Sequence, residues 1–422
     1  MDRQIFVYVD LANTPHLVGR LWLRVRNRIE SATFQYDDSW LQNPERFALK
    51  PALQIDTAPY HTATGRRLFG AIGDSAPDRW GRALMMRAEA RRERKAGEPP
   101  RTLWEADYLL LVGDETRQGA LRFAEREGGP FLRQVVDHRT PPLIELPALL
   151  AASEHVYDEV ETGEDLRLLL APGSSLGGAR PKASVRDHDG ELAIAKFPHH
   201  ADRINTVLWE AVALRLASAA GINTSKARIE RVAKRSVLLL RRFDREGTGR
   251  VPFLSAMSML GAADHETRSY LEIADAIQQY GAAPTDDLHE LWRRIVFSIL
   301  ISNTDDHLRN HGFLYEGNQG WRLSPAYDLN PVPIQFRPRI LSTLIDEQSG
   351  DASLELALSV AEYFRLSQPQ ARKIACEVAR AVSRWRQEAT SAGIAEREIE
   401  MMASAFEHED FTQAQKLKTA KR

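Results

Sequence analysis

The strongest chemical signal in the chain is the segment NTDDHLRN, which runs from Asn303 to Asn310. It follows the apolar run IVFSILIS, so its acids and its histidine emerge from a segment expected to be buried, where charge is costly unless it serves a function. Asp305 and Asn310 are five residues apart, which is the D-x-x-x-x-N spacing of a kinase catalytic loop. In that loop the aspartate accepts the proton of the substrate hydroxyl, and the asparagine holds Mg²⁺.

Two other interpretations of this segment remain open. Asp305, Asp306 and His307 could ligate the metal ion of a hydrolase, although such sites draw ligands from several elements and few other histidines lie in suggestive positions. The segment could also be a capped helix end without chemistry.

Three further signals precede or follow this segment. A Gly-rich stretch, GSSLGGARPK, spans residues 173–182 and ends at Lys182, and Gly177 and Gly178 would let backbone N–H groups face a phosphate. Lys196 lies in an otherwise apolar strand, where its ammonium needs an anion, and Glu210 follows on a predicted helix. Asp328 lies in SPAYDL, beyond a predicted hairpin.

Each of these signals has an ordinary explanation when taken alone. The glycines could form a flexible connection without the Walker A pattern, Lys196 could face solvent on an edge strand, Glu210 could be a surface charge, and Asp328 could be a turn residue. Their order carries more information: Gly-rich loop, strand lysine, helix glutamate, Asp-x4-Asn, hairpin and aspartate is the order of parts in a kinase. The sequence therefore predicts ATP- and Mg²⁺-dependent phosphoryl transfer.

The elements that must position these residues form an α+β pattern. Alternating β segments fill the first part of the chain, and helices are predicted from Asp74 and over residues 103–112. Glycines, prolines and charges at 126–145 indicate a linker. A helix over residues 146–170 leads to a hairpin with its turn at Asp189–Gly190, and then to a helix that ends at Gly221.

The remaining segments complete three predicted parts. Two strands follow Gly221, and from Met257 the chain is mostly helical, interrupted by a hairpin that turns at 318–320. We therefore expect a β-rich part at 1–125, the linker at 126–145, a sheet-containing lobe at 146–254 and a helical lobe at 255–422.

Composition excludes several classes of protein. Lys plus Arg total 56 and Asp plus Glu total 58, so the net charge of −2 argues against a general nucleic-acid coat protein. With 43% hydrophobic and 27% charged residues the chain is expected to fold. One cysteine, Cys376, excludes an internal disulfide and a Cys-rich zinc site. Apolar runs are far short of the roughly 18 residues of a membrane span, and no secretory signal is visible, so a cytoplasmic protein is expected.

The chain resembles the HipA family, the serine/threonine kinase toxins of bacterial toxin–antitoxin pairs. The resemblance covers nearly the whole chain and is most specific in NTDDHLRNHGF and SPAYDL; it also includes PDRWGR, GALRF, SSLGGARPK, AIAKFP and RRFDR. It implies a β-rich N-terminal domain and a two-lobed kinase-like domain with a largely helical C-lobe.

The resemblance also implies the roles of individual residues. Lys196 matches the lysine that contacts ATP, Asp305 the catalytic aspartate, and Asn310 and Asp328 the Mg²⁺ ligands. Arg241 and Phe243 match the hinge that contacts adenine through its backbone, although the family usually has Glu in place of Arg241. The remaining ATP-binding positions are Gly177, Gly178, Lys182 and Glu210.

The same resemblance implies regulation and partners. Ser175 matches a serine whose autophosphorylation expels the Gly-rich loop, and Ser174 is the alternative acceptor; Arg180, Lys182 or Arg203 could receive the phosphate. A HipB-like helix-turn-helix antitoxin is the expected partner, with operator DNA contacted mainly through it. The substrate is expected to be a protein, and the family's targets include an aminoacyl-tRNA synthetase.

Three alternatives follow for function and for DNA contact. A catalytically idle HipA-like module could act as a corepressor with the antitoxin. The presence of all four kinase residues counts against this: Lys196, Asp305, Asn310 and Asp328. The enzyme could instead phosphorylate a small molecule or a lipid. The arginine-rich helix over residues 79–101 could add contacts to DNA phosphates, or it could be a solvated face with interspersed glutamates.

Overall fold

The computed structural model describes residues 2–131, 140–170 and 180–417, and the chain divides into two compact units. Unit 1 comprises Met1–His199 and Glu230–Leu254, and unit 2 comprises His200–Ile229 and Ser255–Arg422. The predicted boundary near residue 255 coincides with one of these divisions. The predicted linker at 126–145 lies within unit 1, and its residues 132–139 are outside the described part, so the finer division of the first 254 residues stays a prediction.

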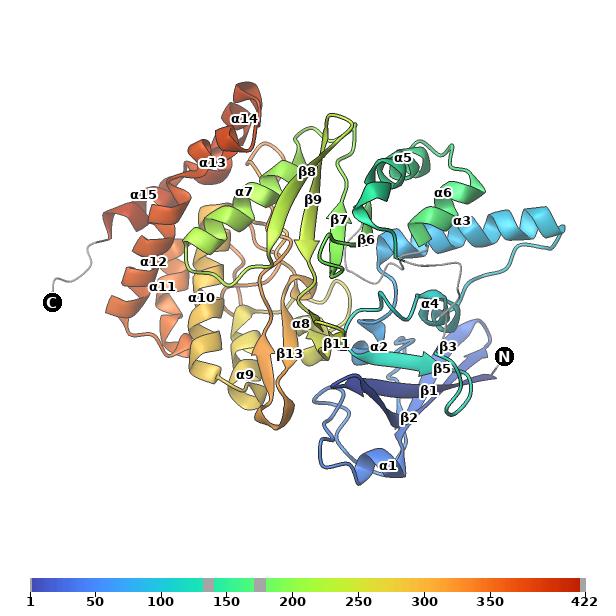
Figure 1. Ribbon diagram of the computed structural model, residues 1–422. Helices are drawn as coiled ribbons and strands as arrows, with labels where there is room; N and C mark the ends of the chain where they lie inside the picture. The colour runs from blue at the N-terminus through green and yellow to red at the C-terminus, as the bar shows by residue number, and fades with distance from the viewer. Residues whose placement is uncertain (1, 132–139, 171–179, 418–422) are drawn as a thin grey trace. The chain divides into compact units, whose positions relative to one another are not determined.

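The first part of unit 1 is built on an antiparallel five-stranded sheet of order β4-β3-β2-β1-β5 (Figure 1). Ile5, Val7 and Val9 of β1 are fully buried, as the alternating pattern predicts. The elements of this part are β1 (Asp2–Leu11), β2 (Thr14–Arg26), β3 (Ile29–Tyr36), α1 (Asp38–Leu41), β4 (Tyr60–His61), α2 (Gly70–Gly73), α3 (Arg79–Ala96), α4 (Glu105–Leu111) and β5 (Leu121–Ala124). The predicted β-rich N-terminal part is confirmed.

A second sheet, of order β6-β7-β9-β8, forms the rest of unit 1, and the division between the units falls within β8. Its strands and the helices beside it are α5 (Leu146–Tyr157), α6 (Gly163–Leu170), β6 (Lys182–Arg186), β7 (Leu192–Lys196), β8 (Ala227–Val232), β9 (Arg235–Arg241), β10 (Arg245–Glu246) and β11 (Gly249–Arg250). β6 and β7 pair around Gly190, whose φ is 82°, so the predicted hairpin is confirmed. Apolar side chains of this sheet, α3, α5 and α6 share one core.

The single helix predicted over residues 146–170 is wrong, because the structure breaks it into α5 and α6. Glu159 has φ of 59°, a left-handed conformation that ends α5. Thr162 and Asp165 then cap α6 reciprocally: Thr162 N–H donates to Asp165 Oδ2 at 2.8 Å, and Asp165 N–H donates to Thr162 Oγ1 at 3.2 Å. This capping box, T-x-x-D, is a start signal within a pattern that is apolar on both sides of it.

Several charges of α3 are paired, both within the helix and with residues beyond its ends. Arg92 and Arg101 both contact Glu89, at 3.0 and 2.5 Å. Hydrogen bonds from Arg92, together with the nearby charges, lower the pKa of Glu89 to about 2 despite partial burial. This pairing matches the interpretation of the helix as a solvated, ion-paired face, and its contact with DNA stays a prediction.

Unit 2 is mainly helical and is organised around α10 (Figure 1). The last part of α10 is buried on all sides, from Ile295 to Leu300, and α9, α12 and α15 pack against this helix. The helices of unit 2 are α7 (Thr206–Ala219), α8 (Ala256–Met259), α9 (Tyr270–Tyr280), α10 (Pro284–Leu300), α11 (Leu354–Ser359), α12 (Gln368–Val382), α13 (Trp385–Ser391), α14 (Glu396–Phe406) and α15 (Glu409–Lys416).

The short strands of unit 2 are β13 (Gly312–Tyr315) and β14 (Trp321–Leu323), which pair antiparallel. β12 (Phe253–Ser255) comes before them in the chain, and the division between the units falls before its last residue. Gly320 ends the turn between β13 and β14 with φ of 113°, and a Cβ atom there would lie 2.5 Å from the carbonyl oxygen of Tyr280. The predicted hairpin and its turn are confirmed. Within the described part of the chain, no helix has the length and apolar character needed to cross a bilayer.

Candidate active site

The predicted catalytic loop begins where α10 ends. Ser302 has φ of 53°, which stops the helix and turns the chain, and Asn303 and Thr304 are fully buried. The side chain of Asp305 is 61% exposed, so its carboxylate is accessible. Asn310 lies buried in a short 3₁₀ turn, Leu308–Asn310, and its amide Nδ2 donates to the carbonyl oxygen of Asp305 at 3.1 Å. The two ends of the D-x-x-x-x-N segment are therefore held together.

Asp306 points the other way, into a buried set of polar groups that we name the loop cluster: Asp306, Tyr270, Ser298 and His311. Its carboxylate accepts from the Tyr270 hydroxyl and from Ser298 Oγ, the latter at 3.1 Å, and lies 3.0 Å from His311 Nε2. The two adjacent acids therefore differ in role: Asp305 faces solvent, and Asp306 fixes the loop through its buried contacts.

The pKa values of the loop cluster follow from this burial. Burial raises the pKa of Asp306, but the charge of His311 and the hydrogen bonds from the cluster outweigh it, and the net shift is downward. Burial and the adjacent carboxylate raise the pKa of Tyr270 well above its ordinary value. Asp306 is accordingly an ion and Tyr270 a neutral hydrogen-bond donor.

This geometry argues against the hydrolase interpretation of the segment. Asp306 commits its carboxylate to the loop cluster, while Asp305 is exposed. Across the described ranges, Asp305, Asp306 and His307 do not come together as a metal-ligating group.

Asp328 is joined to the catalytic loop through Asn330. Asn330 Nδ2 donates to Asp328 Oδ1 at 3.1 Å, and Asn330 N–H donates to the side chain of Asn303, also at 3.1 Å. Asp328 has φ of 59°, an uncommon conformation for a residue with a side chain and one found often at functional sites. The amide oxygen of Asn310 and the carboxylate of Asp328 are hard oxygen donors of the kind Mg²⁺ prefers, so this donor set fits the ion.

One residue at this loop was missed by the sequence analysis. Arg337 Nη1 donates to Asp305 Oδ1 at 2.9 Å. It lies in the segment PIQFRPR, 32 residues beyond Asp305, and no motif or spacing marks it. Only the folded chain brings it to the predicted catalytic aspartate.

Unit 1 carries the predicted lysines side by side. Lys196 at the end of β7 is paired with Lys182 at the start of β6, so the two side chains share one face of the sheet. Lys182 Nζ lies 2.7 Å from Asp78 Oδ2, and both side chains are buried. Asp78 is the N-cap of α3, and so this ion pair ties α3 to the sheet and offsets the repulsion between the lysines. A phosphate-binding role for Lys182 and Lys196 stays a prediction.

The predicted hinge has one residue turned outward and its neighbours buried. The side chain of Arg241 is exposed and pairs with Asp189 and Glu191 of the β6–β7 hairpin, at 3.5 and 3.6 Å. The ring of Phe243 lies 6.1 Å from that of Phe253. Because the Arg241 side chain points toward the hairpin turn, it leaves adenine contact to the backbone of this segment. That contact stays a prediction.

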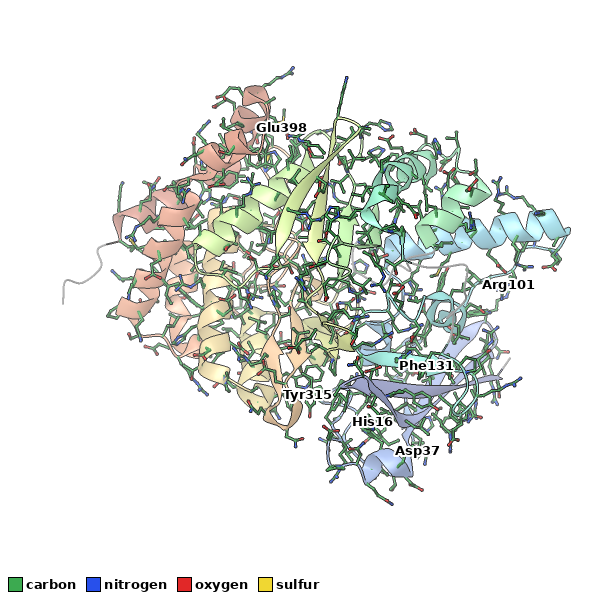
Figure 2. All side chains as sticks on the ribbon, in the orientation of Figure 1. His16, Asp37, Arg101, Phe131, Tyr315 and Glu398 are labelled. Atoms are coloured by element: carbon green, nitrogen blue, oxygen red, sulfur yellow. The ribbon has the colours of Figure 1, made fainter. Side chains whose placement is uncertain are left out.

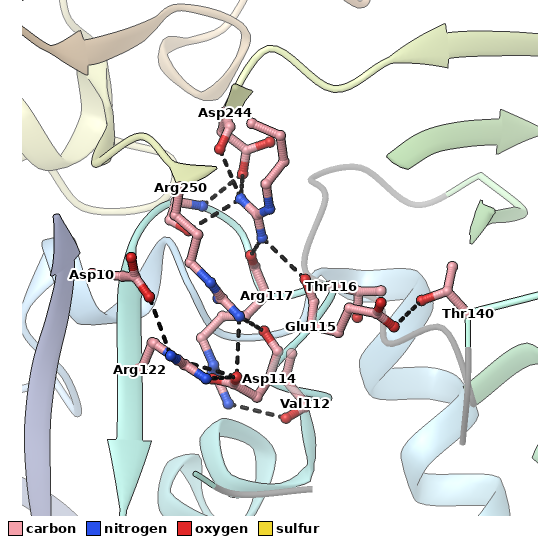
Figure 3. A network of polar contacts seen from close by, with 12 residues as sticks. Asp10, Val112, Asp114, Glu115, Thr116, Arg117, Arg122, Thr140, Asp244 and Arg250 are labelled. Carbon is pink, nitrogen blue, oxygen red and sulfur yellow. Dashed lines mark hydrogen bonds and ion pairs between the residues drawn. The ribbon is translucent and has the colours of Figure 1, made fainter. Parts of the chain in front are cut away.

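Between these two hinge residues begins a buried ionic network, the hinge cluster, shown in Figure 3. Asp244 accepts from Arg242 Nε at 2.8 Å, from Arg245 Nη1 at 2.9 Å and from the Gly119 N–H at 2.7 Å. The cluster comprises Asp10, Asp114, Arg117, Arg122, Arg242, Asp244, Arg245 and Arg250. It connects the hinge to β1, to the residues around β5, and to β11.

The remaining predicted site residues are distributed as follows. Glu210 is buried in α7 of unit 2, beside Trp209, whose Nε1 donates to Glu398 (labelled in Figure 2) at 2.9 Å. Its pairing with Lys196, which belongs to unit 1, stays a prediction. Gly177, Gly178, Ser174 and Ser175 lie outside the described residues.

Comparisons with known proteins support the sequence resemblance. The model of the HipA-like C-terminal domain matches residues 174–385, and that of the HipA N-terminal domain matches residues 9–123. A Sinorhizobium fredii protein named "Putative kinase Y4mE" is 25% identical over 331 residues, 70% of this chain and 71% of that protein. A Haemophilus influenzae protein named "Putative kinase" is 34% identical over 99 residues, which cover 22% of this chain and 29% of that protein.

A solved structure shares the fold of the whole chain. It is the HipA, HipB and operator DNA complex of the Shewanella oneidensis MR-1 toxin–antitoxin system, with a TM-score of 0.64 at 16% identity, covering 97% of this chain and 96% of that one. The α+β fold class, with a β-rich first part and a helical last part, is confirmed.

Proposed function

The chain belongs to the HipA family, and from that premise we propose that it is an ATP- and Mg²⁺-dependent serine/threonine protein kinase acting as a cytoplasmic toxin. The observation that carries the proposal is the catalytic loop, in which an exposed Asp305 is held by Asn310 and backed by the buried Asp306. The relatives named as kinases support the same reaction class.

Each site residue has a role in this proposal. Asp305 accepts the proton of the acceptor hydroxyl, and Asn310 and Asp328 hold the ion. Lys196, oriented by Glu210, binds phosphate oxygens, with Lys182, Gly177 and Gly178 beside them. The backbone at Arg241 and Phe243 receives the adenine. Mg²⁺, when bound, bridges phosphate oxygens and neutralises charge that develops on them.

Regulation by autophosphorylation belongs to the same proposal. A phosphate on Ser175, or on Ser174, adds roughly 1.5 to 2 negative charges. In a loop that covers ATP phosphates this charge repels the nucleotide, so the modified enzyme is inactive.

The proposed partners follow from the family and from its solved complex. The Shewanella structure holds HipA with HipB and operator DNA, which supports a HipB-like antitoxin as partner and DNA contact mainly through it. The substrate we propose is a protein, with an aminoacyl-tRNA synthetase as the first candidate to test.

Mass spectrometry of the purified full chain tests the proposal. Intact and peptide masses are measured before and after incubation with Mg²⁺-ATP, for the wild type, Asp305→Asn and a matched control, Asp275→Asn, which removes an exposed carboxylate on α9. We expect phosphate on Ser175 or Ser174 in the wild type and the control, and none on Asp305→Asn. No phosphate on any of them, together with no ATP binding by calorimetry, would reject the kinase and leave the corepressor module.

A further inference from the structure

Arg337 is the one cationic side chain, among the described residues, within ion-pair distance of Asp305. We propose that Arg337 is a catalytic residue whose guanidinium contacts the phosphoryl group as it is transferred. The inference rests on the proposed kinase function and adds to it a group that no motif of the chain identifies.

Charge at the reacting centre is the reason a cation is needed there. The transferring phosphoryl group carries negative charge on its oxygens, and Asp305 places a further carboxylate beside it. The carboxylate and the phosphoryl oxygens repel each other. A fixed guanidinium offsets this repulsion because it is ionised at all relevant pH values, planar and able to donate several hydrogen bonds.

The arginine of the catalytic loop is directed to another partner. This residue, Arg309, donates to Asp264 at 2.9 and 3.3 Å, away from Asp305. Arg337 instead has a side chain that is 48% exposed, and within the described part of the chain its guanidinium has one hydrogen-bond acceptor, Asp305 Oδ1. Its other N–H groups therefore remain for a phosphate.

The fold holds the segment that carries Arg337 in place. Val332 N–H donates to the carbonyl oxygen of Ser302 at 3.1 Å, and Ser342 N–H donates to that of Thr304, also at 3.1 Å. Both acceptors belong to the turn between α10 and Asp305. The segment is thus hydrogen-bonded to the catalytic loop before and after Arg337.

A second arginine two residues further on shows what a purely structural guanidinium looks like here. Arg339 donates to the carbonyl oxygens of Ile299 and Ala352, to Ser302 Oγ and to Asp410, at 2.7 to 3.1 Å. Its donors are used to fix the end of α10. Arg337, on the same segment, has no such set of partners within the described residues, and this difference marks it as a group that acts on a ligand.

The step that Arg337 assists can be written in full. The acceptor oxygen forms a bond to the γ-phosphorus, the bond from that phosphorus to the β–γ bridging oxygen breaks, and its electron pair leaves on ADP. The hydroxyl proton goes to Oδ2 of the Asp305 carboxylate, whose Oδ1 is held by Arg337. Arg337 keeps its proton and donates hydrogen bonds to the phosphoryl oxygens.

Two measurements on Arg337→Ala, with Arg337→Lys and the exposed control Arg372→Ala, test this assignment. The first is the rate constant of autophosphorylation as a function of ATP concentration, which gives a maximal rate constant and a half-saturating concentration of ATP. We expect Arg337→Ala to lower the maximal rate constant by about 10²-fold with the half-saturating concentration within about threefold, Arg337→Lys to recover part of the loss, and the control to match the wild type.

The second measurement is calorimetric and needs no turnover. The wild type should bind Mg²⁺-ADP with aluminium fluoride, a mimic of the transferring phosphoryl group, more tightly than Mg²⁺-ADP alone. Arg337→Ala should lose most of that gain and keep its affinity for Mg²⁺-ADP. A structural role for Arg337 would weaken both ligands equally.

The outcomes separate the two proposals. An active wild type with an equally active or faster Arg337→Ala overturns the role of Arg337 and leaves the kinase intact. A wild type that transfers no phosphate and binds neither nucleotide complex overturns the kinase, and the role of Arg337 with it.

Discussion

The hinge cluster of unit 1 and the loop cluster of unit 2 are both buried, and they differ in the basic residues that face their acids. In the hinge cluster of unit 1 the basic residues are arginines (Figure 3). Four of them pair with Asp10, Asp114 or Asp244, and a fifth, Arg117, donates to backbone carbonyl oxygens. In the loop cluster of unit 2 the basic residue beside Asp306 is a histidine, His311. A guanidinium keeps its charge in a protein, whereas an imidazole can exist in neutral form.

This difference sets how each cluster responds when its acid is removed. Loss of Asp244 would leave Arg242 and Arg245 charged and buried, with backbone carbonyls as their remaining partners. Loss of Asp306 would leave His311 and Tyr270, both of which can be buried as neutral polar groups. Equal burial therefore does not imply equal dependence on the acid.

The largest effect is expected for Asp244→Asn. We expect it to lower the free energy of unfolding by about 3–5 kcal/mol, because it leaves buried guanidinium charge without its counterion. Urea unfolding measures the loss, and hydrogen exchange of peptides from β9 and β11 locates it. Asp189→Asn, an exposed acid of the same unit, is the control. A cost within about 0.5 kcal/mol of that control would contradict the expectation.

The pH dependence of the same variant sharpens this test. Burial raises the pKa of Asp244, but the charges of Arg242 and Arg245 outweigh it and hold the pKa well below its ordinary value of 3.8. A group with a lowered pKa in the folded state stabilises the protein above its unfolded pKa and loses that contribution as pH falls toward the folded value. The unfolding free energies of wild type and variant should therefore converge below about pH 4. A gap that is the same at pH 7 and pH 3 would count against it.

A smaller effect is expected for Asp306→Asn. The amide keeps the shape and part of the hydrogen bonding to Tyr270 and Ser298, so we expect a loss of about 1–3 kcal/mol in the same urea measurement. Asp275→Asn is the matched control. If Asp306→Asn costs more than Asp244→Asn, the identity of the basic residue does not govern the response, and the comparison between the clusters fails.

The smallest effect is expected for Arg241→Ala. Its ion pairs with Asp189 and Glu191 lie at the surface, and such pairs contribute about 0–1 kcal/mol. If the hinge meets adenine through its backbone, KM for ATP should also stay within about twofold of the wild type. A larger rise in KM would show that this side chain takes part in nucleotide binding.

Local elements were largely predictable from the chain. The hairpin at Asp189–Gly190, the helix that Gly221 closes and the hairpin around Gly320 all depend on turn residues and periodicity within a few residues, and the structure confirms them. The break between α5 and α6 was missed because an apolar pattern on both sides of a short capping box looks continuous.

The candidate site was predictable only in part, because some of its contacts join residues that are far apart in the sequence. The kinase interpretation came from the order of the motifs and from their spacing along the chain. The pairing of Lys182 with Asp78 joins residues 104 apart in the sequence, and no spacing rule relates them. The roles of Lys196, Glu210 and the serines of the Gly-rich loop remain predictions.

The sequence by itself determined the family, the order of the kinase parts, and the candidate residues Asp305, Asn310 and Asp328, because these are encoded in contiguous motifs. Only the tertiary structure decided which of the two adjacent aspartates faces solvent. Asp306 is buried because its partners are Tyr270 of α9, Ser298 of α10 and His311, the residue before β13. It also brought Arg337 to Asp305. Such contacts depend on how distant segments pack, and the free energy of packing is not visible in the spacing of residues along the chain.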